Sequence, residues 1–243
     1  MKVSTKDRLI LALDYDTMAD VERIVDSLRG QVSFYKVGLQ LFSRNGPQAI
    51  RYLVEQGAKV FADLKLHDIP NTVAKATRAL TALGVNIIDV HVSGGMEMMR
   101  AAARAAEEAA QAYGVAKPAV IGVTVLTSLD QHSLAELGLP GEDVTRLAVN
   151  WARLAQAAGL DGVVASPLEA RAIREACGQE FIIVTPGIRP RTVGAHDQKR
   201  ITTPGEALAL GASHLVVGRA ITEAGDPKAM AAAIIQEMEG VSC

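Results

Sequence analysis

Cysteine is scarce in this sequence, and disulfide bonds cannot be the basis of its fold. The 243 residues include only two cysteines, Cys177 and Cys243, fewer than a disulfide framework requires. The N-terminal segment MKVSTKDRL also lacks the long apolar stretch of a secretory signal peptide. We therefore expect a protein of the reducing cytoplasm.

Long apolar runs and a surplus of either charge are missing as well. No run approaches the roughly 18 apolar residues of a membrane span. A formal net charge of -2 and a pI near 6.2 provide no broad basic surface for nucleic acid or anionic membrane. We therefore expect neither of these partners. With 49% hydrophobic and 21% charged residues, the composition is typical of a globular enzyme with a sizeable core.

Short apolar or β-branched runs alternate with helical stretches along the whole chain. Eight such runs begin at Leu9, Phe34, Lys59, Asn86, Ala119, Gly162, Phe181 and His214. A doubly wound open sheet also alternates in this way, but the opening LALDYDTMAD has no G-x-G-x-x-G turn. No linker rich in Pro, Gly or Ser suggests a second domain. The spacing and length predict an α/β fold, a (β/α)₈ TIM barrel in which residues 1–243 form a single domain.

One segment interrupts the apolar pattern with charged residues. FADLKLHDIPNTV, residues 61–73, places Asp63 and Lys65 two residues apart, so regular strand alternation predicts that both side chains point into the barrel mouth. Asp68 follows on the loop, and Lys36 lies in the second apolar run. An internal ion pair that merely fills the barrel end is the structural alternative. Four such charges at strand ends favour a catalytic site instead.

A second polar cluster follows the last two predicted strands. It comprises Pro186 and Arg189 in TPGIRP, Gln198 in a polar loop, and Gly218 and Arg219 in VVGRAIT. Loops after strands seven and eight of such barrels commonly bind phosphate through glycine N–H groups and an arginine. We interpret these residues as a phosphate site, with a solvated arginine beside a turn glycine as the alternative.

Histidine and acidic residues give little support for a metal. The five histidines show neither H-x-x-E-H nor H-E-x-x-H spacing. Asp89 and His91 could ligate a metal, but Lys36 and Lys65 nearby would repel a divalent cation. No cofactor motif is present. We therefore expect no metal and no cofactor.

These motifs together resemble the bacterial orotidine 5′-monophosphate decarboxylase family nearly from end to end. The most specific match is F-A-D-L-K-L-H-D-I-P-N-T, which contains the family's D-x-K-x-x-D signature. Further matches are LALD at 11–14, FYKVG at 34–38, TVLTS at 124–128, VTPGIRP at 184–190 and VVGRAIT at 216–222. The resemblance implies cofactor-free decarboxylation of this nucleotide to UMP and CO₂ in de novo pyrimidine synthesis, by a homodimer with shared active sites.

The resemblance also assigns a role to each matched residue. The catalytic set would be Lys36, Asp63, Lys65 and Asp68. In it Asp63 would lie beside the scissile carboxylate, Lys65 would donate the proton, and Asp68 would enter the neighbouring subunit's site. The ribose would contact Asp14, Lys36 and Thr72 of the partner subunit, the pyrimidine edge would contact Thr127, and the phosphate would contact Pro186, Arg189, Gln198, Gly218 and Arg219.

Two alternatives remain open. Related phosphosugar lyases and decarboxylases share the barrel and the D-x-K-x-x-D signature, but they use Mg²⁺ and carry an acid where this chain has Lys36. A non-catalytic barrel that binds nucleotide phosphate would be expected to have lost some catalytic charges, and none is missing here.

Overall fold

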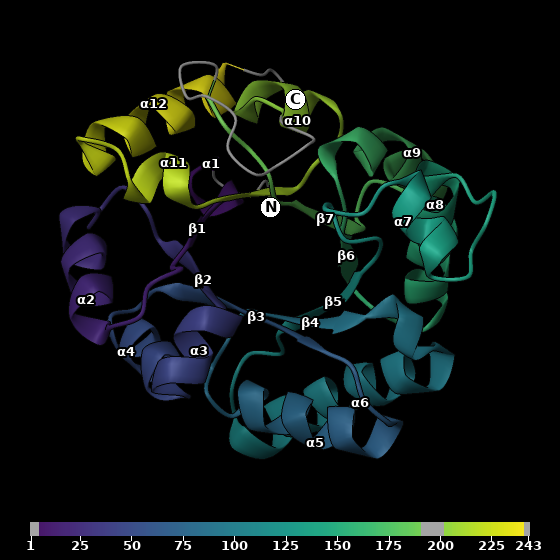
Figure 1. Cartoon of the computed structure of the whole chain (residues 1–243). Coiled ribbons are helices and arrows are strands. Elements are labelled where there is room, and N and C mark those ends of the chain that lie inside the picture. The colour runs from purple at the N-terminus through teal and green to yellow at the C-terminus, as the bar shows by residue number, and fades with distance from the viewer. Residues whose placement is uncertain (1–4, 191–201, 241–243) are drawn as a thin grey trace.

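Eight parallel strands close into a barrel in the computed structural model, which describes residues 5–190 and 202–240. Each strand pairs with its neighbours in chain order, and Figure 1 shows the ring of strands surrounded by helices. The predicted (β/α)₈ barrel is therefore confirmed. The strands are β1 (Leu9–Ala12), β2 (Phe34–Gly38), β3 (Lys59–Leu66), β4 (Ile87–His91), β5 (Ala119–Val123), β6 (Gly162–Val164), β7 (Ile182–Thr185) and β8 (His214–Val217).

The helices lie outside the barrel and connect its strands (Figure 1). Among the described residues, no helix combines the length and apolar character that crossing a membrane requires. The helices are α1 (Thr5–Arg8), α2 (Met18–Ser27), α3 (Leu39–Asn45), α4 (Gln48–Glu55), α5 (Pro70–Thr81), the 3₁₀ turn η1 (Val92–Gly94), α6 (Met96–Tyr113), α7 (Gln131–Glu136), α8 (Val144–Ala157), α9 (Pro167–Cys177), α10 (Pro204–Ala209), α11 (Arg219–Thr222) and α12 (Pro227–Glu239).

Apolar side chains pack on both faces of the strands. This explains why each strand appears in the sequence as a nearly continuous apolar run. In β1, Ile10 belongs to the inner cluster, whereas Leu9 and Leu11 pack with helix residues. Successive side chains of β1 thus point alternately into the barrel and toward the helices, as expected for a strand with both faces buried. The inner cluster consists of Ile10, Ala12, Phe34, Phe61, Ile87, Ile121, Val184 and Val216.

The carboxyl end of β3 departs from regular strand geometry. Ala62 pairs with Ile88 and Leu66 pairs with Val90, so four steps along β3 match only two along β4. The bulge contains Lys65, which has φ 50° and is the one non-glycine residue with positive φ in the described parts of the chain. Regular alternation therefore does not hold at the residues on which the sequence argument relied, although their side chains still meet.

Candidate active site

A cavity of 220 Å³ opens at the carboxyl end of the barrel. Residues from β1, β2, β3 and the segments after β7 and β8 line it, as expected for an active site in this architecture. It brings together many of the residues singled out in the sequence, namely Asp14, Lys36, Asp63, Pro186, Arg189, Gly218 and Arg219.

Alternating charges run across one wall of this cavity. The Lys36 Nζ lies 3.2 Å from Asp14 Oδ1 and 3.2 Å from Asp63 Oδ2. On its other oxygen, Oδ1, Asp63 contacts the ammonium of Lys65. The order is thus carboxylate, ammonium, carboxylate, ammonium. Each charge faces an opposite one, which offsets much of the cost of burying it.

Opposite charges keep the inner pair ionised against the effect of burial. Burial raises the pKa of Asp63, but Lys36 and Lys65 outweigh it and bring the value down to about 2. Burial lowers the pKa of Lys36, but Asp63 and Asp14 outweigh it and raise the value above that of an ordinary lysine. At neutral pH the pair is therefore a carboxylate beside an ammonium.

Gly38 makes room for the Lys36 ammonium. A Cβ added at Gly38 would lie 2.6 Å from Lys36 Nζ and 3.5 Å from Asp14 Oδ1. The backbone at Gly38 has φ -94° and ψ -178°, which any residue adopts. The glycine therefore serves this position by its lack of a side chain.

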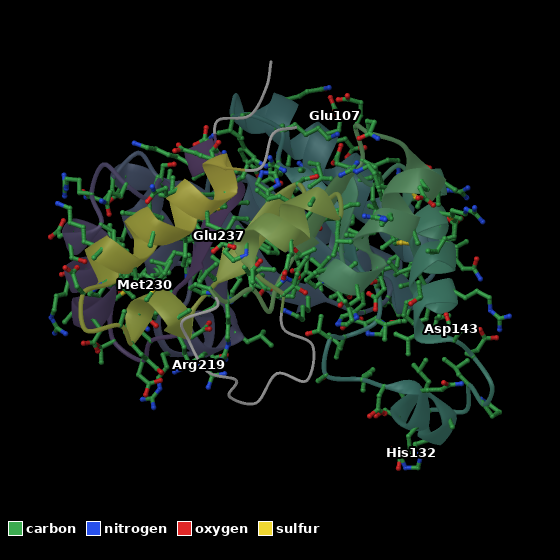
Figure 2. All side chains as sticks on the ribbon, turned by 90° about the horizontal axis from the view of Figure 1, so that it is seen from above. Glu107, His132, Asp143, Arg219, Met230 and Glu237 are labelled. Carbon is green, nitrogen blue, oxygen red and sulfur yellow. The ribbon has the colours of Figure 1, made fainter. Side chains whose placement is uncertain are left out.

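The cavity lining also includes residues predicted to bind phosphate, from the segments that follow β7 and β8. Arg189 is 5% exposed, and its backbone N–H donates to Thr202 O at 3.1 Å. Arg219 is exposed and begins α11 directly after Gly218. In Figure 2, Arg219 lies at the same end of the barrel as His132 on α7, whereas Glu107 lies at the opposite end. Gln198 falls outside the described residues.

Four predicted site residues among those that the structure describes do not line the cavity. Lys65 lies next to it, in contact with Asp63. Asp68 is exposed, and one of its oxygens, Oδ1, accepts the N–H of Ile69 at 2.6 Å. Thr72 is exposed in the first turn of α5. Thr127 is partly buried in the segment between β5 and α7. Asp68 and Thr72 thus lie outside the cavity that Asp14, Lys36 and Asp63 of the same chain line.

Sequence reasoning missed the place of Asp89 in this site. The sequence places Asp89 at a strand end and offers it as a metal ligand with His91, whereas in the structure its fully buried carboxyl group accepts the backbone N–H of Lys65 at 2.8 Å. Across the described residues, no three His, Cys, Asp or Glu side chains are grouped as a metal site would need. An acid within the apolar run IIDVH was the available signal, because such a group is costly to bury without a partner.

This arrangement can bind an anion at one end and do proton chemistry at the other. Arg189, Arg219 and Gly218 all line the cavity, and guanidinium groups are well suited to binding a phosphate. Lys65, at the other end of the charge array, presents an ammonium group held against Asp63. An ammonium in this position can stabilise and protonate a carbanion formed next to it.

Comparisons with known proteins agree with this geometry. The family model described as "Orotidine 5'-phosphate decarboxylase / HUMPS family" matches residues 7–234. A protein named orotidine 5′-phosphate decarboxylase from Moorella thermoacetica is 53% identical over 99% of this chain and 96% of its own length. One of the same name from Syntrophotalea carbinolica is 48% identical over 98% and 97%.

Solved structures give the same result. The crystal structure of orotidine 5′-phosphate decarboxylase from Lactobacillus acidophilus superposes with a TM-score of 0.82 at 37% identity, covering 95% of this chain and 98% of that one. The matches to the family model, to full-length relatives and to this solved structure thus agree with the barrel fold. The chain belongs to the orotidine 5′-phosphate decarboxylase / HUMPS family.

Proposed function

We propose that this protein decarboxylates orotidine 5′-phosphate to UMP and CO₂ in de novo pyrimidine synthesis, with no metal and no organic cofactor. The observation that carries the proposal is the alternation of Asp14, Lys36, Asp63 and Lys65 beside a cavity that contains two arginines. Relatives matched over nearly their full length bear the name of this enzyme, which supports the same reaction here.

The proposed orientation of the substrate follows from the charges. The phosphate contacts Arg189, Arg219 and the Gly218 backbone, and the ribose hydroxyls contact Asp14 and Lys36. The cavity of 220 Å³ is smaller than the roughly 300–1,000 Å³ typical of sites that enclose a whole ligand. The pyrimidine ring therefore extends beyond it toward Lys65, and its carboxylate faces Asp63.

In the proposed mechanism, two charged groups act on the bond to the carboxylate. The C6–carboxylate bond breaks, CO₂ leaves, and the electron pair remains on C6. Asp63 at about 4 Å from the substrate carboxylate contributes repulsion of about 4 kcal/mol at an effective dielectric constant of about 20, and departure of CO₂ relieves it. Enzymes lower barriers by roughly 8–23 kcal/mol, so this repulsion alone is insufficient.

Lys65 provides the larger contribution in this mechanism. Its ammonium stabilises the negative charge that develops at C6 and then gives that carbon a proton. Lys36 holds Asp63 from the other side, so the array is in place before the substrate binds. Binding energy from the remote phosphate supports assembly of the site around the reacting carbon.

Metal independence follows from the same ion pairs. A divalent cation at this site needs free carboxylate oxygens. Both oxygens of Asp63 already contact an ammonium, and Asp14 is paired with Lys36. The two lysines therefore occupy the positions that a cation would take, which favours the decarboxylase over the Mg²⁺-dependent alternative.

We further propose that two subunits share each active site, in a homodimer located in the cytoplasm. Asp68 and Thr72 lie outside the cavity of their own chain and are exposed. Ile69 between them is 67% exposed, so this segment presents an apolar side chain that a second copy can cover. Docking of a second copy on this segment would bury Ile69 and bring Asp68 to the charge array of the partner.

Product identification tests the reaction itself. Purified wild-type protein with orotidine 5′-phosphate should yield UMP and CO₂ in equal amounts, and Lys65→Ala should lower kcat by roughly 10²–10⁴-fold as the proton donor is lost. Lys228→Ala, an exposed substitution on α12, serves as the matched control and should retain full activity. Absence of UMP from the wild-type reaction would refute the proposed function.

Mixing two inactive variants tests the shared site. In a hybrid of Lys65→Ala and Asp68→Ala subunits, one site carries both lesions and the other carries neither. Random exchange gives about half hybrids, so about a quarter of wild-type activity should return. If exchange is complete and no activity returns, the active sites are not shared in this way.

A further inference from the structure

The bulge in β3 takes one backbone N–H out of the strand pairing, and a side chain from β4 accepts it. Because β3 has extra residues between its pairs with Ile88 and Val90, the Lys65 N–H lies outside the regular ladder. Lys65 also has φ 50°, a conformation that costs a non-glycine residue about 1–3 kcal/mol and persists only where its surroundings impose it. Oδ1 of Asp89 accepts this N–H at 2.8 Å.

Asp89 also faces both charged side chains of the bulge. Its Oδ2 lies 4.0 Å from Lys65 Nζ, and its carboxyl group is close enough to Asp63 for each acid to shift the pKa of the other. On the other side, β5 places the apolar Ile121 in register with Asp89. The charged groups that face Asp89 are thus Asp63 and Lys65, with Lys36 beyond Asp63.

The closeness of the two carboxyl groups favours a proton on one of them. Oδ2 of Asp89 is fully buried and finds no donor group among the described residues. Two ionised carboxylates side by side would repel each other, whereas one shared proton makes a hydrogen bond. Burial and the charge of Asp63 both raise the pKa of Asp89 well above its ordinary range. Asp89 is therefore the neutral acid, and Asp63 keeps the charge.

We propose that Asp89 is a positioning residue for the decarboxylation proposed above, on which this inference rests: it holds the Lys65 backbone in the β3 bulge and so keeps the Lys65 ammonium against Asp63. Asp89 does not touch the reacting carbon in this arrangement. It acts through Lys65, whose backbone N–H it accepts, and as a neutral acid it can donate a hydrogen bond to Asp63.

Two substitutions separate the positioning role from other roles. In Asp89→Asn, the amide oxygen accepts the Lys65 N–H and the NH₂ group donates to Asp63, at the same net charge. We expect kcat within about threefold of wild type. Asp89→Leu is similar in size but leaves the Lys65 N–H without its acceptor. A displacement of the ammonium by about 1 Å should lower kcat by about 100-fold, whereas KM should change by less than about threefold because the phosphate contacts are intact.

The pH dependence of kcat provides a second measurement. An amide replaces a neutral acid without changing the charge of the array, so the kcat profiles of wild type and Asp89→Asn should coincide between pH 5 and 9. A displaced profile would mean that Asp89 carries a charge in the working enzyme, and the proposed hydrogen-bond arrangement would be wrong.

A control and a folding measurement complete the experiment. Thr77→Val replaces another fully buried polar group, on α5 and outside the site, and should leave kcat unchanged. Thermal melts and UMP binding establish that each variant is folded. If Asp89→Leu fails to fold, Asp89→Ala replaces it with the same expectation, and a loss of activity in Asp89→Asn overturns the proposal in any case.

Failure of this inference differs from failure of the proposed function. If wild-type protein forms no UMP from orotidine 5′-phosphate, both the proposed function and the positioning role of Asp89 are wrong. If wild-type protein forms UMP and folded Asp89→Leu has an unchanged kcat, the positioning role alone is wrong.

Discussion

Replacement of Arg219 by alanine should weaken phosphate binding and leave the chemistry at the pyrimidine intact. Arg219 is exposed at the edge of the cavity, whereas Arg189 is 5% exposed and remains in the variant. A hydrogen bond between charged groups contributes about 1.5–3 kcal/mol. Solvent screening at an exposed side chain favours the lower half of that range. We therefore expect kcat/KM to fall by roughly ten- to fortyfold.

The assay compares two substrates that differ only in the phosphate. With orotidine 5′-phosphate, Arg219→Ala should show the loss in kcat/KM given above. With orotidine, which has no phosphate for Arg219 to bind, the variant and the wild type should react at similarly low rates. Added phosphite should raise the wild-type rate on orotidine more than that of the variant. Arg23→Ala, which removes a 74% exposed side chain on α2, is the matched control and should behave as wild type on both substrates.

An equal loss on both substrates would refute this reasoning. Arg219 would then act on the fold or on the pyrimidine ring, and its assignment to the phosphate would be wrong.

Two further predictions concern the space beside the Lys36 ammonium and the pH dependence of folding stability. Gly38→Ala places a methyl group 2.6 Å from Lys36 Nζ, so it should lower kcat by roughly ten- to a hundredfold in steady-state assays. Gly225→Ala, where an added Cβ meets nothing within 4 Å, should not. Burial, with Arg8 and Lys59, lowers the pKa of His214 to about 4 from 6.5, so the folded protein keeps this ring neutral. The neutral ring contributes at most about 3 kcal/mol to the free energy of unfolding. This contribution is fully present above pH 6.5 and is lost as the pH falls toward 4. In urea titrations between pH 4 and 7, the free energy of unfolding of His214→Gln should fall less with decreasing pH than that of the wild type. An equal fall in both proteins would contradict this prediction.

The barrel could be predicted from the sequence because its signal is repeated. Each strand is buried on both faces, so each appears as a short apolar run, and eight runs at suitable spacing leave few other architectures. The same rule identified the strand-end residues that line the cavity, because parallel strands bring their carboxyl ends together. These predictions depend on local pattern and on the general geometry of parallel sheets.

The β3 bulge and the role of Asp89 could not be predicted in this way. Alternation placed Asp63 and Lys65 on one face of a regular strand, whereas the structure brings them together through a bulge and a positive φ at Lys65. That geometry depends on a pairing register between strands that are distant in sequence. Exposure of Asp68 likewise has no local signature, because the D-x-K-x-x-D spacing does not indicate which subunit's site the second acid faces.

The most direct test of cofactor-free decarboxylation is turnover in the absence of metal. Purified protein is dialysed against excess EDTA, orotidine 5′-phosphate is added, and the UV absorbance change that accompanies its conversion to UMP is followed with and without Mg²⁺. Because Lys36 and Lys65 already neutralise Asp14 and Asp63, we predict the same kcat in EDTA and in Mg²⁺. Loss of turnover in EDTA and its recovery with Mg²⁺ would contradict catalysis by the charged side chains alone and would favour the Mg²⁺-dependent alternative.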